Sequence, residues 1–134
     1  MDEKKYLKMI VTLVEKTKAG KIPWKKTGSS DAFVTPINKY YSISVTQSEW
    51  DDNTSYHIKL QDREGDLIES ISSYDLNLWN ANQPEPLFKE SGREIIEKLF
   101  NMARRKALGV DQAVESILEQ LESGEIADPD EIPF

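Results

Sequence analysis

Hydrophobic residues recur at two spacings along the chain, and these spacings separate helical segments from strands. Between residues 3 and 19 they fall three or four positions apart, which predicts an amphipathic helix with one buried side. Lys16 and Lys18 suit the last turn of this helix, and Gly20 can adopt the left-handed conformation that ends it. The positions of the buried side are Tyr6, Leu7, Ile10, Leu13, Val14 and Thr17.

Between residues 32 and 72 hydrophobic and polar residues alternate, as in strands with one buried face. Pro36 cannot donate a ladder hydrogen bond, so the first strand is expected at a sheet edge. In the second strand Tyr41, Ile43 and Val45 face one way. In the third, Tyr56, Ile58 and Leu60 point inward, and His57 and Lys59 point outward. The expected strands, separated in part by the turns SEWDDN and DREG, are 32–37, 40–46, 55–61 and 66–72.

The C-terminal half reads as helical after a loop at 73–90, in which SYDLNLW can form a short helical turn. Ser91 and Glu94 make a capping box, which predicts a helix that ends at Gly109. Asp111 is the expected cap of a further helix ending at Gly124. The apolar positions are Ile95, Ile96, Leu99, Phe100, Ala103 and Ala107 in the first helix, and Val114, Ile117, Leu118 and Leu121 in the second.

These elements predict an α+β fold, in which a four-stranded antiparallel meander sheet carries the N-terminal helix and the two C-terminal helices on one face. Residues 1–124 are the expected domain. Residues 125–134 hold two prolines and few apolar residues, so we expect a flexible acidic tail.

The net charge of the chain is −7, but the charged residues are distributed unevenly along it. Residues 1–26 contain eight lysines and three acids, whereas residues 111–134 contain eight acids and no base. Such polarity is typical of an interaction tail, although two solvated faces that happen to differ would give the same count. No apolar run is long enough for a signal sequence or a membrane span, so we expect a cytoplasmic protein with no membrane partner.

Residues for catalysis or metal binding are sparse. There is no cysteine, which excludes disulfides and thiolate chemistry, and the single histidine, His57, lies on an expected outward strand position. The chain shows no glycine-rich phosphate loop and no recognisable nucleophile motif. We therefore expect a protein that is not an enzyme and that needs neither metal nor cofactor.

Two segments carry residue types that bind single-stranded nucleic acid, in which lysines contact phosphates and aromatic rings stack on bases. In GKIPWKKTG, Trp24 stands among Lys21, Lys25 and Lys26, and the outer sheet face offers Tyr40 and Lys59. A structural interpretation competes with this one: Ile22 and Trp24 close over the core, and the lysines keep the loop solvated.

The last seven residues, DPDEIPF, give the most specific signal. They resemble the acidic tip of bacterial single-stranded-DNA-binding proteins, which typically ends in several Asp, Ile or Leu, Pro and Phe. Glu131 replaces the usual Asp and Pro129 interrupts the acids, but the charge pattern is kept. The resemblance implies replication, recombination and repair proteins as partners. The residues that would bind them are Asp128, Asp130, Glu131, Ile132, Pro133 and Phe134.

The remainder of the chain does not resemble the five-stranded barrel of that family. The function expected is an accessory protein of DNA metabolism that docks through its tip and binds single-stranded DNA weakly through its body, with avidity if it forms a homo-oligomer. In a competing interpretation Phe134 folds back onto the body of its own chain. The acidic residues of the tail then lie along Lys4, Lys5, Lys8, Lys25 and Lys26. The alternative function is a small regulatory domain that binds a protein or ligand and whose tail is packed or incidental. Its origin would be a host, a phage or a mobile element.

Overall fold

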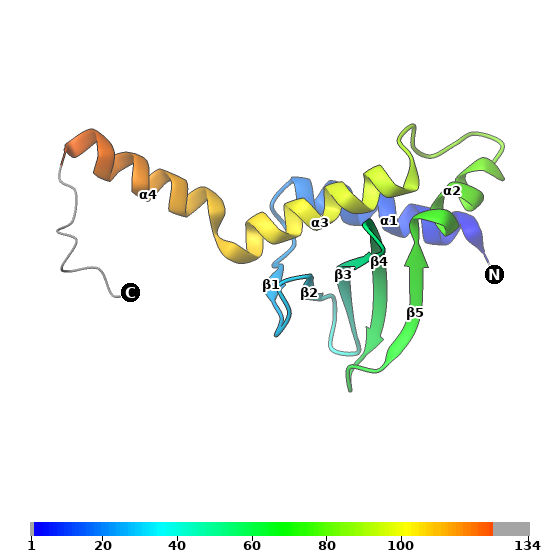
Figure 1. The fold of residues 1–134 in the computed structure, drawn as a ribbon. Coiled ribbons are helices and arrows are strands. Elements are labelled where there is room, and N and C mark those ends of the chain that lie inside the picture. The colour runs from blue at the N-terminus through cyan, green and yellow to red at the C-terminus, as the bar shows by residue number, and fades with distance from the viewer. Residues whose placement is uncertain (1, 125–134) are drawn as a thin grey trace.

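The computed structural model describes residues 2–124, which form four helices and five strands (Figure 1). The α+β class expected from the sequence is confirmed. Along the chain, the elements are α1 (Glu3–Lys18), β1 (Lys25–Lys26), β2 (Ala32–Pro36), β3 (Tyr41–Trp50), β4 (Asn53–Asp62), β5 (Leu67–Ser72), α2 (Ser73–Ala81), α3 (Gly92–Leu108) and α4 (Val110–Ser123).

The sheet is an antiparallel meander with the strand order β1-β2-β3-β4-β5. The prediction of four strands was wrong, because Lys25 and Lys26 pair with Val34 and Phe33 and add a short fifth strand at the edge. A segment of two residues is too short to show alternation, so only backbone pairing reveals it. The β3–β4 turn is also tighter than expected, since only Asp51 and Asp52 lie between the strands, with φ of 50° and 66°.

One face of the sheet is buried under helices. Phe33, Val45, Ile58 and Ile71 form a single row across β2 to β5, and each is at most 2% exposed. From α3, Phe100 packs its ring 5.4 Å from that of Phe33 and 5.7 Å from that of Tyr56. The inward direction predicted for Ile43, Val45, Tyr56 and Ile58 is confirmed, whereas Tyr41, at the start of β3, is 53% exposed.

The segment after β5 forms a helix, α2, rather than the predicted loop with one helical turn. Ser72 caps it by accepting from the Asp75 amide, while the Asp75 carboxylate accepts from the Ser72 amide. A close contact then joins α2 to α3. A Cβ on Gly92 would lie 2.2 Å from the carbonyl oxygen of Ser73, so this approach requires glycine.

The last helix, α4, does not pack on the sheet, and the prediction that both C-terminal helices cover one face was wrong for this element. Figure 1 shows α4 continuing away from the body beyond α3, and none of its residues is buried. Gly109, with φ of 64°, ends α3 and begins α4, so Asp111 lies in the first turn rather than at the cap. Amphipathic spacing predicts an apolar stripe but cannot show what covers it.

Candidate interaction surfaces

An apolar groove runs along the side of α1 that faces away from α3. Its floor consists of Met9 and Leu13 from α1, Ile22 from the following loop, and Ile37 and Ile43 from the β2–β3 region. It encloses about 400 Å³. We call it the α1 groove.

Lysines form the rim of the α1 groove on its α1 side, where Lys5, Lys8 and Lys16 are exposed. They gather there because spacings of three and eight residues bring side chains to one flank of a helix. Within residues 2–124, ion pairs join Arg93 to Glu97 and Arg105 to Asp111, and neither includes a lysine. The groove thus combines an apolar floor with positive charge that no described carboxylate neutralises.

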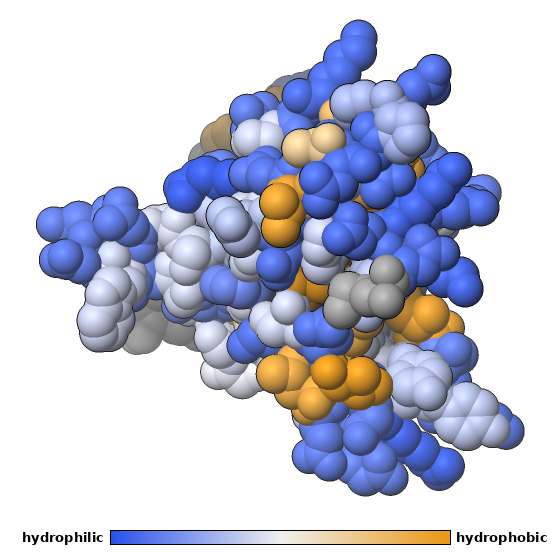
Figure 2. Space-filling model, turned by 90° about the vertical axis from the view of Figure 1, so that its right-hand side faces the viewer, coloured by the Kyte–Doolittle hydropathy of each residue, from blue (hydrophilic) through white to orange (hydrophobic). Residues whose placement is uncertain are grey.

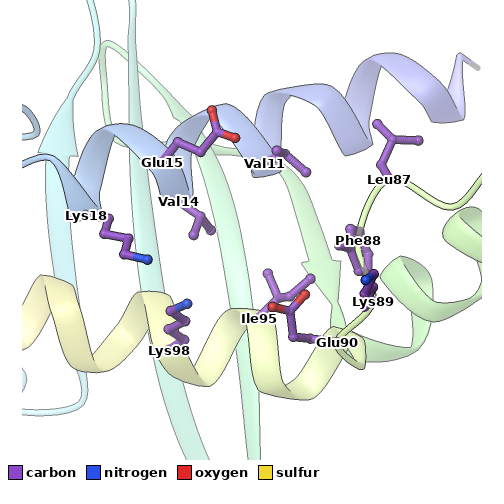
Figure 3. A pocket seen from close by; sticks show the side chains of 10 residues that line it. All are labelled: Val11, Val14, Glu15, Lys18, Leu87, Phe88, Lys89, Glu90, Ile95 and Lys98. Atoms are coloured by element: carbon purple, nitrogen blue, oxygen red, sulfur yellow. The ribbon is translucent and has the colours of Figure 1, made fainter.

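A second hollow, of about 370 Å³, lies between α1 and α3 (Figure 3). Its apolar lining comes from Val11 and Val14 on α1, Leu87 and Phe88 on the segment before α3, and Ile95 on α3. In Figure 3 the ammonium groups of Lys18 and Lys98 point toward each other across the gap between the helices. Glu15, Lys89 and Glu90 also line the hollow, so its charges are mixed. The part between Lys18 and Lys98 suits the anionic end of an apolar group.

The exposed side of α4 carries an apolar stripe, and we name Val114, Ile117, Leu118 and Leu121 the α4 stripe. These side chains are between 52% and 60% exposed. At 100° per residue, the carboxylates of Asp111, Glu115 and Glu122 fall along one edge of the stripe and form an acidic flank. Asp111 also pairs with Arg105, yet its side chain is 85% exposed. An amphipathic helix with these properties fits a groove that is apolar at its floor and basic at its rim.

The residues predicted to bind single-stranded nucleic acid do not come together as one patch. Trp24 is 3% exposed, and its Nε1 donates a hydrogen bond to Thr17 Oγ1 at 3.0 Å. Its ring therefore belongs to the core and offers no face to a base, which corrects its assignment as a stacking residue. Tyr40 is half-exposed in the β2–β3 turn, where Lys39 lies 5.1 Å from its ring centre.

The outer sheet face carries two of the predicted lysines. Lys25, Val34, Ser44 and Lys59 follow one another across β1 to β4, which places Lys25 and Lys59 about 14 Å apart at the usual strand spacing. Lys21 and Lys26 are exposed close to Lys25 in sequence. Hydroxyl side chains occupy much of this face, and Ser44 among them is buried. They are Ser42, Ser44, Thr46, Ser48, Ser55, Ser70 and Ser72.

The residues of the acidic tip, Asp128, Asp130, Glu131, Ile132, Pro133 and Phe134, lie outside the described residues. Among residues 2–124, no three His, Asp or Glu side chains are grouped so that they could hold a metal ion. No helix in that range has the length and apolar character needed to cross a bilayer. Comparisons with protein-family models, with curated proteins and with solved structures found no match.

Proposed function

We propose that the protein is a non-enzymatic accessory protein of DNA metabolism, whose acidic tip at residues 128–134 binds replication, recombination or repair proteins. The supporting observation is the position of α4. This helix leaves the body and spans 14 residues, or about 21 Å, before it ends at Gly124. The segment that contains the tip thus follows an arm rather than a buried element.

The chemistry of the tip supports docking in a small basic pocket. Burial of the Phe134 ring in the pocket contributes about 1.5–3 kcal/mol to binding. A carboxylate of the tip that pairs with an Arg or Lys of the partner adds about 1.5–3 kcal/mol. Pro133 restricts the backbone and lowers the cost of ordering. Asp128, Asp130 and Glu131 steer the tip toward positive charge. After the cost of ordering the tip is subtracted, we expect a binding free energy near about −8 kcal/mol, which corresponds to a Kd in the micromolar range.

Calorimetric titration of the full chain with a purified repair protein tests this proposal. The repair protein is chosen because it binds the tail tip of a bacterial single-stranded-DNA-binding protein. Phe134→Ala should weaken binding at least about tenfold, because the ring supplies one of the two main contacts. Tyr40→Ala is the matched control, since it removes an exposed aromatic ring from the body. Equal affinity of the Phe134→Ala and intact chains would reject the tip as the docking element.

Weak binding of single-stranded DNA by the body is the second part of the proposal. With Trp24 in the core, the contribution left to Lys21, Lys25, Lys26 and Lys59 is phosphate contact, which falls steeply with salt. A labelled oligonucleotide titrated at low salt should bind the intact chain more tightly than a Lys25→Glu, Lys59→Glu variant. Lys18→Glu, Lys98→Glu carries the same charge change away from the sheet. If the two double variants lose affinity equally, the outer sheet face is not the binding surface.

The α1–α3 hollow favours the alternative function, a small regulatory domain that binds a ligand. Its apolar walls and the opposed Lys18 and Lys98 match an aromatic or aliphatic carboxylate. A thermal-shift series with phenylpropionate should raise the Tm of the intact chain and leave a Lys18→Ala, Lys98→Ala variant unchanged. An unchanged Tm for the intact chain at millimolar ligand counts against this alternative.

A further inference from the structure

We infer that α4 of one copy of the chain binds in the α1 groove of a second copy. The inference concerns residues 2–124 alone and does not depend on the acidic tip. It rests on three observations: an uncovered apolar stripe, a groove of matching character, and opposite charges in matching positions.

The α4 stripe is an unusual feature for an isolated chain. Its four large side chains are each more than half exposed and lie along one side of a helix in which no residue is buried. Figure 2 gives a contrast, since the end of the molecule shown there is mostly hydrophilic and its hydrophobic atoms lie in separate groups. Monomers seldom leave a continuous apolar band uncovered, so the stripe indicates a partner.

The α1 groove has the complementary shape and polarity. Its floor is built from five apolar side chains, of which Met9, Ile22 and Ile37 remain partly or largely exposed. Lys5, Lys8 and Lys16 stand along one edge. A helix that lays an apolar stripe on this floor needs acids along the edge that faces α1.

The charges of α4 and α1 match in spacing as well as in sign. Lys5 and Lys16 are eleven residues apart, as are Asp111 and Glu122. Lys8 lies three residues after Lys5, and Glu115 lies four residues after Asp111. When the two helices run side by side in the same direction, the acidic flank of α4 therefore faces the lysines of α1 over about 16 Å.

The position of the groove favours a second copy over the same chain. The residues of α1 that face α3, including Val11 and Val14, line the α1–α3 hollow, whereas Met9 and Leu13 line the groove on the opposite flank. α4 follows α3 directly and points away from the body (Figure 1). An α4 that extends away from the body in this way does not reach the groove of its own chain, which lies on the flank of α1 away from α3.

Charge reversal with the full-length chain provides the test, read by sedimentation velocity at low salt. The intact chain should sediment above its monomer mass of 15.4 kDa. Glu115→Lys with Glu122→Lys places lysines against lysines, and Lys5→Glu with Lys16→Glu places acids against acids. Each double variant should weaken self-association at least tenfold. An equimolar mixture of the two should restore it, because each then offers the charge that the other lacks.

Matched controls separate this arrangement from general charge effects. Lys4→Glu with Lys18→Glu alters α1 outside the groove, and Gln120→Lys adds a lysine to α4 on the side of the stripe opposite the acidic flank. Both should associate like the intact chain. An intact chain that stays monomeric at high micromolar concentration would overturn the inference. So would association that is lost in Leu118→Gln but unaffected by both double reversals, because that result means the stripes pair with each other.

Discussion

Trp24 donates from Nε1 to the Thr17 hydroxyl at 3.0 Å, and both side chains lie in the core where α1 meets the following loop. Thr17→Val keeps the volume but leaves the indole N–H without a partner. We expect a loss of about 1–3 kcal/mol in the free energy of unfolding, measured by urea denaturation. Thr17→Ser retains the hydroxyl and should recover part of the loss; a stable Thr17→Val chain would contradict the role of this bond.

Gly92 supplies a second prediction about stability. A methyl group at this position would meet the Ser73 carbonyl oxygen at 2.2 Å, so Gly92→Ala must push α2 and α3 apart. The expected cost is about 1–3 kcal/mol, despite the higher helix propensity of alanine. Gly28→Ala is the control, because a Cβ there meets nothing within 4 Å, and it should stay within about 0.5 kcal/mol.

Tyr56 makes the free energy of unfolding depend on pH in the alkaline range. Burial raises the pKa of its phenol above 10, and the charges of Glu97 and Glu49 add to this, although Arg93 opposes it. The fold therefore favours the neutral phenol. Its contribution is fully present below the unfolded pKa, near 10, and is lost as pH rises through the higher folded pKa.

Urea unfolding between pH 8 and pH 11 would measure this effect. Tyr56→Phe should flatten the loss of stability at high pH, since it removes the ionising group. Tyr40→Phe, at a half-exposed position, should retain the loss seen in the intact chain. If the profiles of the intact chain and Tyr56→Phe coincide, Tyr56 does not set the alkaline limit.

The exposure of α4 can be checked through stability at submicromolar concentration. Leu118→Gln changes an exposed side chain to one of similar helix propensity, so the free energy of unfolding should change by no more than about 0.5 kcal/mol. Ile96→Ala in α3 is the comparison, because Ile96 is fully buried and its truncation should cost about 2–5 kcal/mol. A large loss in Leu118→Gln would mean that α4 packs on its own body.

Sequence periodicity predicted the elements that bury one face, and it failed where burial is not decided locally. The alternation around Ile43, Val45 and Ile58 gave the inward face correctly, since each residue sits opposite another apolar residue in the register. The same reasoning assigned a buried side to α4, because an amphipathic helix has the same pattern whether its apolar side meets its own core or another surface. The sequence did not predict β1, because a strand of two lysines has no periodic pattern.

The candidate surfaces were predictable only in part. The lysines around Trp24 are evident in the sequence, but the direction of the ring depends on the hydroxyl of Thr17, seven residues earlier. Lys5, Lys8 and Lys16 belong to the excess of lysine that the sequence shows over residues 1–26, but the apolar floor beside them comes from Ile22, Ile37 and Ile43. Contacts between distant segments of this kind require the tertiary structure.

Gly109 joins α3 to α4 with a backbone angle that few other residues adopt. Each residue added to or removed from α4 beyond this joint would turn whatever follows by about 100° and shift it by about 1.5 Å. The number of residues in α4 thus sets both the direction in which the chain leaves residue 124 and the distance of that point from Gly109.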